Sequence, residues 1–114
     1  MNTSNSFLNK KVLVEIDRPL GSKHPKWCFE YKLNYGFIPN TISGDGEELD
    51  AYVIGVDIPM EKFTGICIAV IKREEEDDDK LIIAPEGMQF TESEIRAKTN
   101  FQEKSFNIKV VFPE

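Results

Sequence analysis

Three carboxylates lie close together in the segment Asp45-Gly46-Glu47-Glu48-Leu49-Asp50. Asp45, Glu47 and Asp50 stand at positions i, i+2 and i+5 of a glycine-containing turn that leads directly into the apolar run AYVIGV. In extended backbone Asp45 and Glu47 point to one side, and a bend before the strand would turn Asp50 back toward them. Oxygen ligands gathered in this way suit Mg²⁺, which binds a few carboxylates and keeps several waters. The alternative is an ordinary acidic turn at the start of a strand.

Two other charged segments bear on phosphate or metal chemistry. The run from Glu74 to Asp79 holds six adjacent carboxylates, which is typical of a solvated hairpin tip, although one or two of them could face a metal. Cations gather before the second predicted strand, at Arg18, Lys23 and Lys26, where they could hold a phosphate or could simply be scattered surface charges.

Several kinds of site are excluded by what the sequence lacks. His24 is the only histidine, so a histidine-rich zinc site cannot form. Cys28 and Cys67 form no C-x-x-C pair, and their apolar surroundings predict two buried thiols. The sequence has no P-loop and no G-x-S-x-G motif, which argues against P-loop nucleotide hydrolysis and serine hydrolase chemistry.

Short apolar runs bounded by glycine, proline or acidic clusters predict the elements that would position these side chains. The predicted strands are Lys11–Ile16, Trp27–Tyr31, Ala51–Val56, Gly65–Lys72 and Leu81–Ala84, with a possible edge strand at Ile108–Phe112. The stretch NYGFIPNTISGDGEE, with Pro39, is expected to be irregular. Thr91 and Glu94 form a capping box that predicts a helix through EIRAKTNFQEKSF, with Ile95 and Phe101 or Gln102 on its apolar stripe.

The chain length of 114 residues and a hydrophobic content of 40% fit one domain over residues 1–114 with a real core. The elements predict a mainly β (α+β) domain: a small closed or partly open antiparallel β-barrel with one C-terminal helix. A net charge of -6 argues against nucleic-acid binding and against an anionic membrane surface. No apolar run is long enough to span a bilayer, and the N-terminus does not resemble a secretory signal, so we expect a cytoplasmic protein.

Taken together, VEI, NYGFIPNT, DGEELDAYVIG and DDDKLIIAP resemble the soluble family I inorganic pyrophosphatases over roughly residues 12–85. The family signature is Asp-x-Asp-Pro-Leu-Asp, preceded by Asn-Tyr-Gly-Phe-Ile-Pro and followed by Asp-x-Lys-Leu. The resemblance implies an OB-like barrel, a homo-oligomer, and hydrolysis of pyrophosphate to two phosphates with several Mg²⁺ ions, or with Mn²⁺ in their place.

The resemblance also assigns roles to particular residues of this chain. Metal ligands would be the carboxylates of Asp45, Glu47, Asp50, Asp78 and Glu15. Glu47 falls on the candidate general base, Asp50 on a holder of the activating metals, and Tyr35 on a hydroxyl donor to phosphate. Lys80 falls on a phosphate-binding lysine, and Lys23, Lys26 or Arg18 could replace basic residues of a hairpin that is largely missing here.

The chain departs from the family pattern at several positions. Glu47 replaces an aspartate and Glu48 replaces a proline. In an ungapped alignment Arg73 stands where an aspartate metal ligand is expected, and Glu74 could substitute only after a one-residue shift. A C-terminal Tyr-Lys phosphate pair has no clean counterpart, with Lys104 as the only candidate. Two hypotheses follow: a compact Mg²⁺-dependent hydrolase of pyrophosphate or another phosphoanhydride, and a catalytically silent relative that binds a metal or a phosphorylated ligand.

Overall fold

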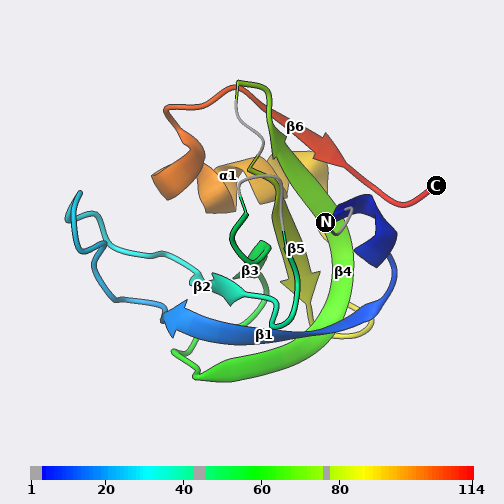
Figure 1. Ribbon diagram of the computed structural model, residues 1–114, viewed down its shortest axis with the longest axis horizontal. Coiled ribbons are helices and arrows are strands. Elements are labelled where there is room, and N and C mark those ends of the chain that lie inside the picture. Colours follow the sequence, from blue (N-terminus) through cyan, green and yellow to red (C-terminus); the bar gives the residue numbers. More distant parts are fainter. Residues whose placement is uncertain (1–3, 43–45, 76–77) are drawn as a thin grey trace.

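The computed structural model describes residues 4–42, 46–75 and 78–114 (Figure 1). A short 3-10 helix, η1, comes first. The elements in chain order are η1 Ser4–Phe7, β1 Lys11–Arg18, β2 Asn34–Phe37, β3 Asp50–Val53, β4 Lys62–Arg73, β5 Lys80–Ala84, α1 Glu92–Glu103 and β6 Ile108–Val111.

Five strands close into a barrel in the order β1-β2-β3-β5-β4, because β1 also pairs with β4. β6 extends the sheet beyond β4. The predicted barrel with one helix is therefore confirmed, and most of its pairings are antiparallel. The exception is β3 with β5, which pair in parallel because the long β4 returns the chain before β5 begins.

The sequence prediction was wrong in one part of the chain, between β1 and β3. The segment Trp27–Tyr31 is not a strand: Cys28 has a φ of 61°, and the segment contributes only an isolated bridge between Lys23 and Glu30. The second strand is instead Asn34–Phe37, which lies in the stretch expected to be irregular. Cys28 is consequently exposed rather than buried, whereas Cys67 is buried as predicted.

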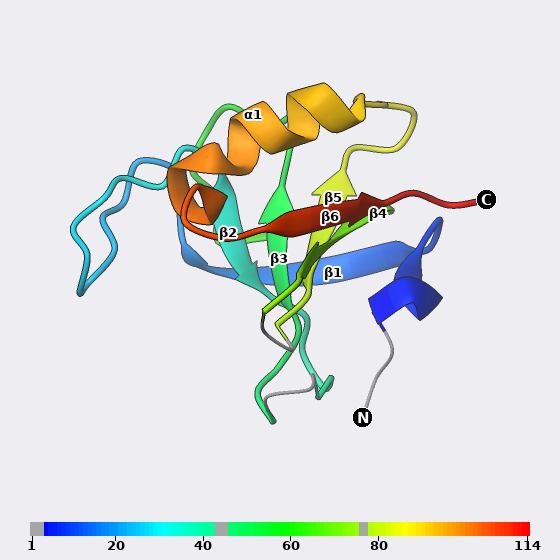
Figure 2. The ribbon, with the colours of Figure 1, turned by 90° about the horizontal axis from the view of Figure 1, so that it is seen from above.

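Apolar side chains fill the molecule in two layers. The barrel interior is built from alternate residues such as Val12, Val14 and Ile16 of β1. The second layer lies between the outer face of the sheet and α1, where Ile95 packs with residues such as Ile82. Figure 2 shows α1 lying across this outer face. The site described below lies on the same outer face, at the C-terminal end of α1.

A close approach of two strands explains the glycine of the NYGF segment. A Cβ atom added at Gly36 would lie 1.9 Å from the carbonyl oxygen of Glu15 and 2.8 Å from the Cα of Ile16. The register of β1 against β2 shifts between Ile16 and Arg18, as in a β-bulge. Gly36 therefore lets the backbone of β2 lie directly against the bend of β1.

The capping box at the start of α1 forms as predicted. The backbone N–H of Glu94 donates to Thr91 Oγ1 over 3.1 Å, and the backbone N–H of Thr91 donates to Glu94 Oε1 over 2.9 Å. Ile95 is buried as expected, but the other buried residues of the helix are Thr99 and Glu103. In the part of the chain that the structure describes, no helix has the length and apolarity needed to cross a membrane.

Candidate active site: a cation-lined cavity beside two aspartates

Strand register brings the candidate residues into one row. Glu15 of β1 pairs with Phe37, Phe37 pairs with Asp50, and Asp50 pairs with Lys80. Asp50 and Lys80 therefore lie on adjacent strands at the same level. Glu15 lies two strands from Asp50, which corresponds to about 10 Å.

Lys80 is the centre of a cluster of charges. Its side chain is 4% exposed, and its Nζ lies 2.7 Å from Asp50 Oδ2 and 3.0 Å from each carboxylate oxygen of Asp78. The Asp50 and Asp78 carboxylates, from β3 and from the start of β5, thus share one ammonium. A buried lysine requires such partners, since an unpaired charge at this depth is strongly unfavourable.

Arg73, at the end of β4, supplies a second buried cation. Its Nε and Nη2 donate to the two oxygens of Glu103 over 2.9 and 3.0 Å, and its Nη1 donates to Asp78 over 3.2 Å. The guanidinium also lies 3.8 Å from the centre of the Phe106 ring. Burial lowers the pKa of Arg73, but the Glu103 carboxylate outweighs this effect and holds the pKa above its ordinary value. Arg73 therefore remains a fixed positive charge.

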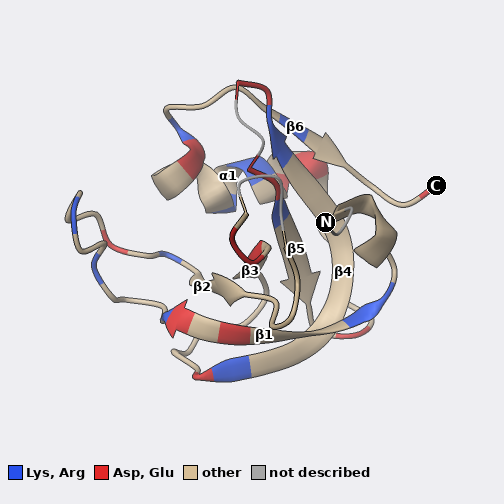
Figure 3. Cartoon of the chain, viewed as in Figure 1, with Lys and Arg blue, Asp and Glu red and all other residues tan. Residues whose placement is uncertain are grey.

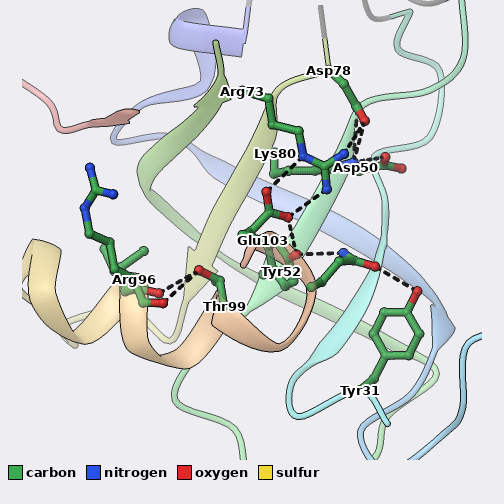
Figure 4. A network of polar contacts seen from close by, with 11 residues as sticks. Tyr31, Asp50, Tyr52, Arg73, Asp78, Lys80, Arg96, Thr99 and Glu103 are labelled. Carbon is green, nitrogen blue, oxygen red and sulfur yellow. Dashed lines mark hydrogen bonds and ion pairs between the residues drawn. The ribbon is translucent and has the colours of Figure 1, made fainter. Parts of the chain in front are cut away.

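Glu103 continues the network toward the helix and the loop (Figure 4). The Tyr52 hydroxyl donates to Glu103 Oε2 over 2.6 Å and accepts from the Gln102 amide, also over 2.6 Å. The Tyr31 hydroxyl donates to Gln102 Oε1 over 3.0 Å. These bonds connect the C-terminal end of α1 with β3, β4 and the loop before β2.

A cavity of about 330 Å³ opens at this cluster. Figure 3 shows basic residues on β4 and β5 next to acidic residues at the start of β3. The lining residues are Asp17, Arg18, His24, Trp27, Phe29, Tyr31, Tyr35, Arg73, Lys80, Gln102 and Phe106. Arg18, Arg73 and Lys80 give this lining several N–H donors for the oxygen atoms of a small anion, beside the carboxylate of Asp17.

Burial shifts the pKa of two titratable groups at the cavity. Burial, followed by the charge of Asp50, raises the pKa of Tyr35 well above 10, and Tyr35 therefore keeps a hydroxyl proton that can be donated. Burial also raises the pKa of Asp78, against the lowering effects of Lys80 and Arg73. The ring of Tyr35 lies 5.6 Å from Lys80 Nζ, which places its aromatic face beside the same cation.

Of the nine sequence-predicted site residues, five come together at the cavity, three are exposed elsewhere, and one lies outside the described residues. Arg18, Tyr35 and Lys80 line the cavity, and Asp50 and Asp78 contact Lys80. The other four are Lys23, exposed in the loop before β2, Glu15, exposed on β1, Glu47, exposed before β3, and Asp45, which lies outside the described residues. The roles assigned to these nine residues stay predictions.

Asp50 and Asp78 are two described carboxylates that could hold Mg²⁺. Over residues 4–42, 46–75 and 78–114, no three Asp, Glu, His or Cys side chains are grouped closely enough to hold a metal ion. The carboxylates of Asp50 and Asp78 lie close enough to share the ammonium group of Lys80. Mg²⁺ is commonly held by one or two carboxylates, with waters and substrate phosphates as its other ligands. At position 73, where the resemblance leads us to expect a third metal-binding carboxylate, Arg73 instead places a guanidinium against Asp78.

Sequence reasoning missed the residues that connect the site with the helix. Glu103, Gln102, Tyr31 and Tyr52 come from three separate parts of the chain, and no spacing pattern joins them. The one available signal was the unexpected arginine at position 73, because a buried arginine needs a buried carboxylate elsewhere. The sequence alone did not show that this carboxylate is Glu103.

The barrel with its one helix defines the fold class, and the family follows from comparison with known proteins. The family model described as inorganic pyrophosphatase matches residues 9–112, and this chain belongs to that family. The inorganic pyrophosphatase of Rickettsia prowazekii is 37% identical over 98 residues, covering 68% of this chain and 57% of the relative. That of Aeropyrum pernix is 32% identical over 83 residues, covering 69% of this chain and 44% of the relative. The chain thus spans about half the length of the curated relatives it matches.

Solved structures show the same fold. The inorganic pyrophosphatase of Ehrlichia chaffeensis matches with a TM-score of 0.69 at 19% identity, covering 90% of this chain and 85% of that structure. The inorganic pyrophosphatase of Thermus thermophilus matches with a TM-score of 0.60 at 21% identity, covering 89% of this chain and 80% of the other. At these identities the likeness concerns the barrel and its helix, not the chemistry of the site.

Proposed function

We propose that this protein hydrolyses inorganic pyrophosphate to two phosphates and that it requires Mg²⁺, with Mn²⁺ as a substitute. The observation that carries the proposal is the convergence of Lys80, Arg18 and Tyr35 on one cavity, directly beside the carboxylates of Asp50 and Asp78. Family membership supports the same reaction. A site of this kind combines donors for phosphate oxygens with ligands for a hard cation.

In this proposal the residues have separate tasks. Lys80 and Arg18 bind the phosphate oxygens, and the protonated hydroxyl of Tyr35 donates a hydrogen bond to them. Asp50 and Asp78 hold Mg²⁺, aided by a carboxylate of the turn before β3. When bound, Mg²⁺ neutralises substrate charge and lowers the pKa of a bound water. Glu47, on the same turn, accepts a proton from the attacking water.

A phosphate-release assay with pyrophosphate and Mg²⁺ tests the proposal. We expect turnover in the wild type and at least a tenfold loss in Asp50→Asn, because the variant removes a metal-binding charge. Asp57→Asn is the matched control, since Asp57 is an exposed aspartate of the loop after β3. Turnover that persists in excess chelator, or equal turnover in Asp50→Asn and wild type, would contradict the proposal.

The role of Glu47 is tested separately, with Glu47→Gln and Glu47→Asp. A base must lie within about 2.6–3.2 Å of the proton that it abstracts, or reach it through one water. We expect Glu47→Gln to reduce turnover strongly and Glu47→Asp to retain or raise it. Equal turnover in Glu47→Gln and wild type would remove Glu47 as the base.

A second candidate function is binding without turnover. Arg73 favours it, since a guanidinium contacts Asp78 where the family pattern has another metal-binding carboxylate. Calorimetry that detects pyrophosphate binding with no phosphate release would support this silent relative. Release of phosphate from another phosphoanhydride, with none from pyrophosphate, would show that the protein is a hydrolase of that other compound.

Two expectations from the sequence also remain proposals: a homo-oligomer and a cytoplasmic location. Sedimentation velocity tests the first, because an oligomer has a mass above the 13.1 kDa of one chain. Fractionation of cells that produce the protein tests the second.

A further inference from the structure

The charged cavity continues into a second cavity with a different character. The second cavity has a volume of about 430 Å³ and lies between the loop before β2 and the C-terminal end of α1. Its lining residues are Trp27, Phe29, Phe101, Gln102, Lys104, Ser105 and Phe106. Trp27, Phe29, Gln102 and Phe106 line both cavities, so the two form one depression with a cationic end and an aromatic end.

The aromatic end contains a large apolar side chain, Trp27, that is not buried in the core of the protein. Trp27 is 67% exposed, although burying an indole is among the largest apolar gains available to a folded chain. The neighbouring rings of Phe29 and Phe101 pack against each other with centroids 6.0 Å apart, which gives the cavity a firm aromatic wall. Figures 1 and 2 both show the loop of residues 19–33 extending beside the C-terminal end of α1.

Trp27 is presented on an ordered turn. His24 Nδ1 accepts the backbone N–H groups of Lys26 and Trp27 over 3.0 and 3.1 Å, and the backbone N–H of Cys28 donates to the His24 carbonyl over 3.1 Å. The His24 ring in turn packs 5.0 Å from the centre of Phe29. These contacts fix the backbone of the turn that carries the exposed indole, and Lys26 Nζ lies 4.8 Å from the centre of the Trp27 ring.

The combination of the two ends points to a ligand with both phosphates and an aromatic ring. Lys80 and Arg18 at the cationic end match a diphosphate, whereas inorganic pyrophosphate leaves the aromatic cavity unfilled. A nucleobase offers two flat faces, and stacking of a base on an aromatic side chain does not depend on the identity of the base. A ribose would span the region between the two ends, near Gln102.

We propose that the depression binds a nucleoside diphosphate, with its phosphates at the cationic end and its base stacked on Trp27. This inference rests on the proposed function, because the same phosphoanhydride bond is attacked at the same site. The oxygen of a water bonds to the terminal phosphorus, and the bond from that phosphorus to the bridging oxygen breaks. The electron pair stays on the bridging oxygen of the departing nucleoside monophosphate. One water proton remains on the released phosphate and the other goes to the solvent.

Trp27 gives the test an optical signal, because it is the only tryptophan of the chain and it lines both ends of the depression. ADP and pyrophosphate are titrated separately into the wild type with Mg²⁺. We expect ADP to quench the fluorescence in a saturable way, and we expect pyrophosphate to displace the bound ADP. Calorimetry then gives the Kd of ADP and of pyrophosphate for wild type, Trp27→Leu and Trp27→Phe.

The ratio of the two Kd values is the decisive quantity. Loss of one stacking contact should raise the ADP-to-pyrophosphate ratio about tenfold in Trp27→Leu, and Trp27→Phe should restore most of it. An unchanged ratio in Trp27→Leu overturns the nucleotide site, as does the absence of any ADP binding while pyrophosphate is hydrolysed. Fluorescence quenching could instead depend on protein concentration and not on ADP, with a dimer seen in sedimentation velocity. That result would mean that a second copy of the chain covers the aromatic cavity, and it would also overturn the nucleotide site.

The outcomes separate this inference from the proposed function. Pyrophosphate turnover without ADP binding leaves the proposed function standing and removes the nucleotide site. ADP binding that is sensitive to Trp27, with no phosphate release from either compound, supports the nucleotide site and removes the hydrolysis.

Discussion

Arg73 is the residue that most changes the character of this site. A carboxylate at this position would extend the acidic cluster, whereas the guanidinium neutralises Asp78 and Glu103 and binds the end of β4 to the end of α1. The pair with Glu103 is deeply buried, with side chains 8% and 2% exposed. Its removal therefore tests stability as well as function.

We expect Arg73→Met to destabilise the protein by about 3–5 kcal/mol, because Glu103 would remain charged and buried without its main partner. Glu103→Leu should have a similar effect for the converse reason. The double variant should recover much of the loss, since the two charges disappear together. Urea unfolding of the four proteins measures the coupling.

The exposed pair Arg96–Glu92 is the control for this experiment. Its side chains are 43% and 51% exposed, and pairs of this kind contribute at most about 0.5 kcal/mol. Arg96→Met should therefore change the free energy of unfolding only slightly. Additive effects of the two single changes at Arg73 and Glu103 would contradict a coupled buried pair.

The two cysteines differ in reactivity because they differ in burial. Burial raises the pKa of Cys67 to about 12, so that it remains a protonated thiol, whereas Cys28 is exposed in the loop before β2. We expect a thiol reagent at neutral pH to modify one cysteine per folded chain and two after denaturation. Mass spectrometry of the peptides should locate the first modification at Cys28, and a fast reaction at Cys67 in the folded protein would contradict its burial.

At the scale of single elements, β2 depends on one glycine. We expect Gly36→Ala to destabilise the barrel by more than about 3 kcal/mol, since the new Cβ would lie 1.9 Å from the Glu15 carbonyl oxygen and backbone would have to move. Gly87→Ala is the comparison: Gly87 has a φ of 89° but nothing within 4 Å, so only the backbone conformation resists, at about 1–2 kcal/mol. Thermal unfolding of both variants compares the two losses of stability. An equal loss of stability in Gly36→Ala and Gly87→Ala would refute a steric role for Gly36.

The capping box of α1 gives the stability of the protein a defined dependence on pH. Hydrogen bonds from the Thr91 backbone and side chain lower the pKa of Glu94 below its ordinary value of 4.5. The stabilisation is therefore complete above about pH 4.5 and disappears as the pH falls through the lowered pKa. We expect Glu94→Gln to be less stable than the wild type at pH 6 and to approach it near pH 3. A difference in melting temperature that stays constant from pH 6 to pH 3 would show that the Glu94 charge plays no part.

The parts of this structure that could be predicted are those determined by interactions between residues close in the sequence. The parts determined by contacts between distant segments could not be predicted. β1, β4, β5 and α1 were predicted because their short apolar runs and the Thr91–Glu94 box are local signals. The turn at Trp27 was mistaken for a strand because it is formed by the backbone N–H groups of Lys26 and Trp27 donating to His24 Nδ1, which no apolar pattern records. β2 was missed because Pro39, Gly44 and Gly46 led us to expect irregular structure over the whole stretch, although Gly36 lets its first residues pair with β1.

The residues of the site also divide into those found from local motifs and those placed by contacts between distant segments. Asp50, Asp78, Lys80 and Tyr35 could be found because the resemblance rests on short motifs that contain them. Their convergence with Arg18 is a product of strand register and of the bulge in β1. The Arg73–Glu103 pair depends on how α1 crosses the sheet, and no local feature of either segment contains that information.

At the scale of the whole molecule, cation binding should stabilise the fold. Asp50 and Asp78 lie close together at the cavity, and Mg²⁺ that binds the native state alone would raise stability by RT ln(1 + [L]/Kd). We expect millimolar Mg²⁺ to raise the melting temperature of the wild type and to have a smaller effect on Asp50→Asn, with Asp57→Asn behaving as wild type. A melting temperature that ignores both Mg²⁺ and Mn²⁺ would argue against a metal site at these residues.

Closure of the barrel has a consequence for the order in which the protein can be assembled on the ribosome. Lys11 pairs with Ile66, so one edge of β1 has no partner until 55 more residues have been synthesised. At about 5–20 residues per second this interval lasts roughly 3–11 s, during which the alternating strand KVLVEI could pair with another nascent chain. Lys11 and Glu15 lie on the exposed face of that strand. Besides any part they have in the finished protein, these charges act as gatekeepers that oppose aggregation until β4 arrives.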